Sequence, residues 1–245
     1  MKKYKLTNET IVHLGFTLYR IEALMDFSDV KTGDKGGFVQ SENNLSQLGN
    51  AWVYGNAKVY GNAEVYGDAE VYGDAEVYDN AEVYNNAKVC GNASVFCDAK
   101  VYGNAVVYGN AVVFENAEVY DNAKVYGNAK VCGNAEVCGD AGIYGNAFVC
   151  DYVKVCGDAG VYGKAEVRGD AKVYKNSDYI VFKNWWSSGR YFTWTRSNKM
   201  WKVGCFYGNG EELIKKAYAD SEESGREYER VVRYVESILA DELNK

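Results

Sequence analysis

Tryptophan and arginine side chains gather near the C-terminal end of the 245-residue chain. Four of its five tryptophans lie there, with arginines between them: Trp185, Trp186, Arg190, Trp194, Arg196 and Trp201. An aromatic ring beside an arginine can stack on a base while the guanidinium binds a phosphate. The same residue types also anchor protein partners at interfaces. These six residues are therefore candidates for binding a ligand or a partner.

The same pattern also fits the core of a small α+β domain over residues 177–245. Strands are predicted over 179–183, 190–195 and 200–206, and helices from Asn209 and over about 226–243. Such a sheet would bury one aromatic face on the helices while the arginines extend at its edge. Trp185 and Trp186 are adjacent, so in a strand they face opposite ways and only one need be buried. The other is the best candidate for an exposed anchor.

The elements that position these side chains follow from a six-residue repeat. Residues 51–176 hold twenty-one copies of the phrase A-x-V-Y-G-N, with small variations and without an insertion or deletion. Ala and Val lie two positions apart and point to one side of a short strand. The Gly-Asn or Gly-Asp pair that follows favours a turn. A strand and a corner repeated with this period predict a parallel β-helix whose narrow Ala and Val interior has no room for a ligand.

The repeat resembles a known family. Read from Val53, the unit Val53-Tyr54-Gly55-Asn56-Ala57-Lys58 is similar to that of the left-handed hexapeptide-repeat proteins, with Tyr where that family often has Gly. The resemblance covers about half of the chain and implies a left-handed parallel β-helix. Three units would form one triangular coil of eighteen residues, and the twenty-one units about seven coils. Trimers are common in this family, so the resemblance also implies a homo-oligomer, either a trimer or a dimer.

Residues for acid–base or metal chemistry are scarce. Acyltransferases of the hexapeptide family use a histidine as general base and a loop from the coils to shape the acyl-donor site. Here the only histidine, His13, lies outside the coils, and no loop interrupts residues 51–176. Relatives of the carbonic-anhydrase type bind zinc through several histidines, and none of the seven cysteines forms a C-x2-C pair. We therefore expect no catalytic residue, metal or cofactor.

Stacking at eighteen residues per coil would sort side chains into columns. Cys132 would lie next to Cys150, and Cys138 next to Cys156, close enough for disulfides to be geometrically feasible. We expect these cysteines to remain free thiols packed as apolar side chains in a reducing cytosol. One face of the prism would be the most apolar, and three of its residues are candidates for an interface: Val112, Phe114 and Phe148. An ordinary aromatic ladder accounts for the same residues.

The net charge of −7 lies on the repeat. Residues 51–176 hold ten Lys and Arg against seventeen Asp and Glu, while the segments on either side are neutral. Seven coils would be roughly 34 Å long, giving about one net charge per 5 Å, whereas duplex DNA carries about one per 1.7 Å. Nucleic-acid binding is disfavoured, and mimicry of DNA is only weakly indicated. Without a signal-like apolar segment or a membrane-length apolar run, we expect a cytoplasmic protein of a bacterial host cell.

The segments outside the repeat should cover its two ends, because a β-helix exposes unpaired strand edges there. Residues 1–50 are predicted to form an N-terminal β cap with short strands at 4–6, 11–14 and 17–21. Residues 26–39 and 49–54 are similar to the start of uncharacterised bacterial and phage hexapeptide-repeat proteins, some of which are labelled putative acyltransferases. That label derives from the repeat.

The sequence thus predicts a non-enzymatic scaffold for protein binding or assembly, with a phage origin implied by the resemblance. Two alternatives stay open. The chain could be a phage inhibitor that occupies a host defence protein through its acidic surface. It could also sequester a nucleotide in the Trp- and Arg-rich C-terminal domain.

Overall fold

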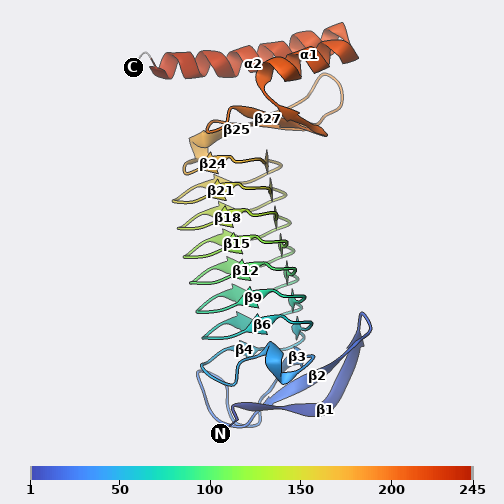
Figure 1. Cartoon of the computed structure of the whole chain (residues 1–245), viewed down its shortest axis with the longest axis vertical. Coiled ribbons are helices and arrows are strands. Elements are labelled where there is room, and N and C mark those ends of the chain that lie inside the picture. Colours follow the sequence, from blue (N-terminus) through green and yellow to red (C-terminus); the bar gives the residue numbers. More distant parts are fainter. Residues whose placement is uncertain (1, 244–245) are drawn as a thin grey trace.

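The structure, a computed structural model, describes residues 2–243. A β-solenoid forms the long axis of the molecule, an N-terminal hairpin lies at one end, and a small sheet with two helices lies at the other (Figure 1). The solenoid is parallel throughout, because each short strand pairs in register with the strand eighteen residues on.

Three sheets form the sides of the solenoid, and their strands are two residues long. One side holds β5 (Lys58–Val59), β8 (Glu76–Val77), β11 (Ser94–Val95), β14 (Val112–Val113), β17 (Lys130–Val131), β20 (Phe148–Val149) and β23 (Glu166–Val167). The second holds β4 (Trp52–Val53), β7 (Glu70–Val71), β10 (Lys88–Val89), β13 (Val106–Val107), β16 (Lys124–Val125), β19 (Gly142–Ile143) and β22 (Gly160–Val161). The third holds β6 (Glu64–Val65), β9 (Glu82–Val83), β12 (Lys100–Val101), β15 (Glu118–Val119), β18 (Glu136–Val137), β21 (Lys154–Val155) and β24 (Lys172–Val173).

The solenoid interior consists of the repeated Ala and Val side chains. From Ala51 to Val173 these positions are almost all fully buried in one continuous cluster, as the repeat predicts. Small side chains suit this interior because three sheets meet around a narrow axis. The residue between Ala and Val points outward, so each coil alternates a core position with a surface position.

Backbone hydrogen bonds join each coil to the next. The outward residue donates from its N–H to the carbonyl of the Ala in the next coil, as from Lys88 to Ala105 at 2.9 Å. At the corners, the Asn side chains form a second ladder, in which Asn92 donates to Asn110 at 3.2 Å. The residue before each Asn or Asp adopts a positive φ, and this is why Gly is frequent at that place.

The solenoid has about eight coils rather than the seven counted from the repeat. Strand β3 (Lys35–Val39) pairs in parallel with β5, with Val39 opposite Val59. Leu45 bridges Val65 on the third sheet. These pairs are twenty residues apart instead of eighteen, so the first turn of the solenoid lies outside the strict six-residue period.

The N-terminal segment forms a hairpin that extends the first sheet. Strands β1 (Tyr4–His13) and β2 (Phe16–Ala23) pair antiparallel, and β2 pairs with β3. The two strands expected over 4–6 and 11–14 are therefore one strand, which carries a register shift between Leu6 and Thr10. Behind the hairpin, the ring of Trp52 is buried against Tyr4 and Phe27 at centroid distances of 6.0 and 5.4 Å.

The C-terminal segment forms a four-stranded antiparallel sheet and two helices. Its strands are β25 (Tyr179–Lys183), β26 (Tyr191–Thr195), β27 (Met200–Val203) and β28 (Phe206–Gly208). The single strand expected over 200–206 is thus two strands, because the chain reverses at Gly204, whose φ is +53°. Helix α1 (Gly210–Asp220) follows Asn209, which caps its N-terminus at the predicted helix start. Helix α2 (Glu222–Leu243) begins about four residues before the predicted start.

The C-terminal sheet covers the open end of the solenoid (Figure 1). The N–H of Glu166 donates to the Thr193 hydroxyl at 2.9 Å, and the N–H of Lys172 donates to the Ser197 hydroxyl at 2.7 Å. In a longer solenoid these two N–H groups would donate to the carbonyls of one further coil. The sheet therefore supplies the acceptors that the last coil lacks, which is the task of a cap.

Candidate functional site

One tryptophan of the candidate cluster is exposed to solvent. Trp185 lies on the turn between β25 and β26, and 79% of its surface is accessible. The buried Asn184 fixes this turn: its side-chain oxygen accepts from the N–H of Ser187 at 2.9 Å, and its backbone N–H donates to the carbonyl of Arg190 at 2.7 Å. The amide of Asn184 also donates to the Tyr228 hydroxyl at 3.3 Å, which ties the turn to α2. The indole of Trp185 is thus presented by an ordered turn.

The ring of the next residue, Trp186, lies edge to face with that of Trp185 at a centroid distance of 6.0 Å but is largely covered by the domain. Trp186 packs edge to face on Tyr228 and Phe192, at centroid distances of 5.4 and 6.1 Å. Its indole N–H is buried and has no hydrogen-bond partner among the described residues. Adjacent tryptophans in this chain therefore have different environments: one contacts solvent and the other joins the domain core.

Trp194 and Trp201 belong to the core of the C-terminal domain. Each is about 2% exposed, and they pair across β26 and β27 with their rings 6.5 Å apart. Their residual exposure faces a hollow of about 350 Å³ between the sheet and the helices, which Lys199, Glu211 and Glu236 also line. Both carboxylates bind Arg233, at 2.5 and 2.8 Å, and this guanidinium holds the pKa of Glu211 below its usual range. The lining therefore holds two carboxylates and one cation, Lys199, and this balance does not favour a phosphate group.

The arginines of the candidate cluster lie apart from these rings. Arg190 is exposed at the end of the Trp185 turn and lies beside Gly204. Arg196 donates from Nε to the carbonyl of Ser177 at 3.3 Å, so it fastens the sheet to the segment that leaves the last coil. The six predicted residues thus lie in three different places: the exposed turn, the core of the C-terminal domain, and the contact between its sheet and the segment that leaves the last coil. The structure does not assemble them into one pocket.

The predicted apolar face of the solenoid is interrupted. On the first sheet, Lys130 lies in register between Val112 and Phe148. Phe114 stacks on Phe96 with a centroid distance of 5.3 Å, and the guanidinium of Arg168 lies 4.6 Å from the ring centroid of Phe148. All three predicted side chains are partly buried by these neighbours. They form part of the ladder on this sheet and do not make a continuous apolar patch.

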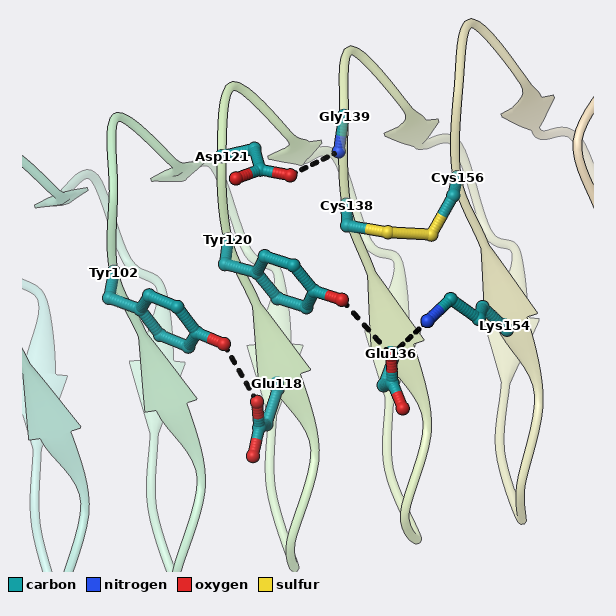
Figure 2. The surroundings of a disulfide bond; sticks show 9 residues. All are labelled: Tyr102, Glu118, Tyr120, Asp121, Glu136, Cys138, Gly139, Lys154 and Cys156. Atoms are coloured by element: carbon teal, nitrogen blue, oxygen red, sulfur yellow. Dashed lines mark hydrogen bonds and ion pairs between the residues drawn. A yellow bond between two sulfur atoms is a disulfide. The ribbon is translucent and has the colours of Figure 1, made fainter.

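The cysteine columns are paired, and the expectation of four free thiols is wrong in this structure. Disulfides join Cys132 to Cys150 and Cys138 to Cys156, each with a Cα–Cα distance of 4.6 Å. Figure 2 shows the second of them. The physical reason is the stacking itself, since equivalent residues of successive coils come within the range that a disulfide spans. The remaining cysteines, Cys90, Cys97 and Cys205, are free.

A carboxylate lies beside one of these disulfides. The donor atoms of Glu115, Cys132 and Cys150 all lie within 4.8 Å of one another. Sequence reasoning missed this contact. It also missed that Arg168 occupies the place after Cys150 in the same column. The signal was present, because Glu115 stands one residue after the column position and Arg168 is the one charged residue in that column.

The single histidine is engaged at the tip of the N-terminal hairpin. His13 lies 3.1 Å from a carboxylate oxygen of Glu76 and packs edge to face on Tyr60. Glu76 also accepts from Lys58 and from the Tyr60 hydroxyl, at 3.1 and 3.2 Å. Burial raises the pKa of Glu76, but the bonds from Lys58 and His13 outweigh it and lower the pKa overall. This network fixes the hairpin against the first coils.

The comparisons with known proteins bear on the repeat. A family model described as the YdcK beta solenoid repeat matches residues 99–115, which lie in the middle of the solenoid. No curated protein matches the chain. Within residues 2–243, neither helix combines the length and the apolar content that crossing a bilayer requires. The match and the coordinates agree that the chain is a β-solenoid repeat protein.

Proposed function

We propose that the chain is a non-enzymatic scaffold that binds a protein partner through the turn carrying Trp185. The observation that carries this proposal is the exposure of that indole on a turn held by the buried Asn184. A tryptophan that is ordered before binding loses little conformational entropy when a partner covers it. Large aromatic side chains of this kind dominate the binding energy at many interfaces.

The charges around the turn indicate the chemistry of the partner. Lys183 and Arg190 are exposed on either side of Trp185. We infer a partner surface with an apolar pocket for the indole and carboxylates at its rim. This chemistry differs from that of the solenoid, which carries the acidic charge of the chain. A homo-oligomer formed through the Trp185 turn and an acidic solenoid face of a second copy would satisfy the same requirement.

A role as an inhibitor of a host defence protein is a special case of this proposal, in which the acidic solenoid would contribute a second contact. Sequestration of a nucleotide is less well supported, because Trp194 and Trp201 are buried and carboxylates line the adjacent hollow. Acyl transfer lacks support because His13 belongs to the N-terminal hairpin and is engaged there with Glu76 of the solenoid. Measurable turnover of acetyl-CoA would contradict the non-enzymatic part of the proposal.

Quantitative affinity capture tests the proposal. The full chain, Trp185→Ala and Tyr152→Ala would each be used to capture proteins from a bacterial lysate, with quantification by mass spectrometry. Tyr152 is the control, because it is also a highly exposed aromatic residue but lies on the solenoid. A partner retained by the control and lost at least tenfold by Trp185→Ala supports the proposal. Retention by Trp185→Ala, with loss upon joint substitution of Val112, Phe114 and Phe148, would place the interface on the solenoid instead.

A further inference from the structure

The two disulfides form a matched pair that differs in the charged residues around it. Both join residues eighteen apart, both span the same two coils, and both have a Cα–Cα distance of 4.6 Å. Each also has an acidic residue at the equivalent corner of the preceding coil. Glu115 accepts from the N–H of Gly133 at 2.6 Å. Asp121 accepts from that of Gly139 at 3.2 Å (Figure 2). The two disulfides therefore share their sequence separation, the coils they join and the acidic residue of the preceding coil. Cys150 is in addition followed by Asp151, where Cys156 is followed by Gly157.

The cations near the two disulfides differ because the next residue of each column differs. After Cys150 the column continues with Arg168, and after Cys156 it continues with Tyr174. Val149 and Val167 are in register, and the N–H of Cys150 donates to the Val167 carbonyl at 3.2 Å, so Cys150 and Arg168 are direct neighbours. The cation near the second disulfide is Lys154, which already binds Glu136 at 2.6 Å (Figure 2).

Arg168 has capacity for a further anion. Its guanidinium lies over the ring of Phe148, and its Nη1 is 3.8 Å from an oxygen of Asp151, which is longer than a hydrogen bond. Its Nε–H is buried and has no hydrogen-bond partner within the described residues. A buried donor without an acceptor is costly. A thiolate at Cys150, formed when the disulfide is reduced, would supply an anionic acceptor beside this cation.

The surface next to this column suits a small anion. Phe148 and Arg168 line a shallow groove of about 510 Å³ together with Lys130, Lys164 and Glu166. Three cations against one carboxylate give this groove a net positive charge, and Glu166 is also paired with Lys202 at 3.4 Å. This local charge is opposite to that of the solenoid as a whole.

We propose that Cys132 and Cys150 are a redox-active pair that exchanges with the disulfide of a small, carboxylate-bearing thiol, whereas Cys138 and Cys156 are a structural disulfide. Arg168 stabilises the thiolate of Cys150, which makes this sulfur the nucleophile. The carboxylate of Glu115 lies within 4.8 Å of both sulfurs and disfavours a negative charge on either. Arg168, which is next to Cys150 in the column, therefore decides that the proton stays on Cys132.

The exchange balances without a further reagent. The Cys150 thiolate attacks one sulfur of the small disulfide, whose S–S bond breaks and releases one thiolate. Cys132 then attacks the Cys150 sulfur, the mixed disulfide breaks, and the second small thiolate leaves. The proton of Cys132 passes to a departing thiolate. The protein pair is oxidised to a disulfide, and the small disulfide is reduced to one thiol and one thiolate.

Differential alkylation of the reduced full chain tests this assignment. At pH 6, iodoacetamide should modify Cys150 at least tenfold faster than Cys156, as measured by peptide mass spectrometry. Arg168→Tyr, which gives this column the residue found at the same place beside the other pair, should remove most of this difference, and Arg168→Lys should restore part of it. The reverse change, Tyr174→Arg, should accelerate Cys156. Equal rates at Cys150 and Cys156 in the unchanged chain would overturn the proposal.

A redox titration gives a second readout that does not depend on alkylation rates. In a series of thiol and disulfide mixtures, the stabilised thiolate should make Cys132–Cys150 easier to reduce than Cys138–Cys156. The expected tenfold difference in the exchange constant corresponds to about 30 mV. Circular dichroism of the reduced protein and of each variant would establish that the solenoid remains folded. If the two pairs share one midpoint, the proposal is wrong.

Varying the charge of the small disulfide distinguishes exchange that depends on the groove from unspecific exchange. At each cysteine, the rate of oxidation by the disulfide of 3-mercaptopropionate is divided by the rate of oxidation by cystamine. This ratio should be higher at Cys150 than at Cys156. The Cys138–Cys156 pair corrects for the intrinsic reactivity of the two reagents. An equal ratio at both pairs would contradict the role of the groove. Protection of Cys132 and Cys150 by Zn²⁺, lost in Glu115→Gln, would identify a metal site and also contradict the proposal.

Discussion

The hydroxyl of Tyr102 donates a hydrogen bond of 2.9 Å to the carboxylate of Glu118 on the next coil (Figure 2). The same contact joins Tyr66 to Glu82 at 2.8 Å and Tyr120 to Glu136 at 3.0 Å. Each pair is sixteen residues apart, because the acceptor stands two positions before the next tyrosine of the column. The aromatic ladder of this sheet is therefore also a ladder of polar contacts between coils.

Removing one of these hydroxyls should destabilise the solenoid. Tyr102→Phe keeps the stacked ring but loses the bond to Glu118, and a bond of this kind contributes about 1 kcal/mol, more when the acceptor is charged. Tyr126→Phe is the control, because the residue sixteen positions on is Gly142, which has no side-chain acceptor. Thermal unfolding followed by circular dichroism should show a lower melting temperature for Tyr102→Phe than for Tyr126→Phe. Equal shifts would show that the bond contributes nothing.

The same contact predicts a loss of stability in alkali. Burial and the hydrogen bond to Glu118 raise the pKa of Tyr102 above its ordinary value of 10.0. Since the folded state holds the proton more tightly than the unfolded state, this contribution is fully present below pH 10. It is lost as the pH rises from there toward the folded-state pKa. Melting temperatures measured from pH 8 to 11.5 should fall less steeply for Tyr102→Phe than for the unchanged chain. A parallel fall in both would contradict the prediction.

Because the coils stack closely at their corners, substitution by alanine should destabilise the solenoid to different extents at two similar glycines. Gly103 and Gly163 have φ values of +71° and +70°, so alanine costs about 1–2 kcal/mol of backbone energy at either position. At Gly103 an added Cβ would lie 2.8 Å from the backbone nitrogen of Asp121, whereas at Gly163 it would meet nothing within 4 Å. Gly103→Ala should therefore lower the melting temperature more than Gly163→Ala. The reverse order would contradict the corner packing.

Substitution of two tryptophans of the C-terminal domain should distinguish an exposed residue that binds a partner from a buried residue that stabilises the fold. Trp185→Ala should change the free energy of unfolding by no more than about 0.5 kcal/mol, because the side chain is exposed. Trp194→Ala should cost about 3–5 kcal/mol, since it empties a core position. Urea unfolding monitored by circular dichroism measures both values. A large loss of stability in Trp185→Ala would mean that this ring is part of the fold and would weaken its assignment as an anchor.

The repeat made most of the solenoid predictable. Its strict phase assigned Ala and Val to the interior and brought Cys132 next to Cys150, because coil stacking depends only on the period. The eighth coil was missed, since Val39 and Leu45 pair at a spacing of twenty and carry no repeat signal. The start of α1 was predictable because Asn209 and Glu212 form a local capping box.

The candidate site was harder to predict because burial depends on contacts that are distant in sequence. Composition could not distinguish the exposed Trp185 from the buried Trp194 and Trp201. The turn that exposes Trp185 is held by Asn184, whose contact with Tyr228 joins residues 44 positions apart. Likewise, the oxidation state of the cysteine pairs was predicted from an assumed compartment and not from the stacking geometry.

Because successive coils stack in register, the number of coils sets the length of the solenoid. Deleting one eighteen-residue coil, such as residues 105–122, would return every remaining side chain to the same column and preserve the hydrogen bonds between coils. The distance between the hairpin at one end and the Trp185 turn at the other would become shorter by about 4.8 Å. The separation of the two ends is therefore set in discrete steps by the number of repeats, independently of what either end binds.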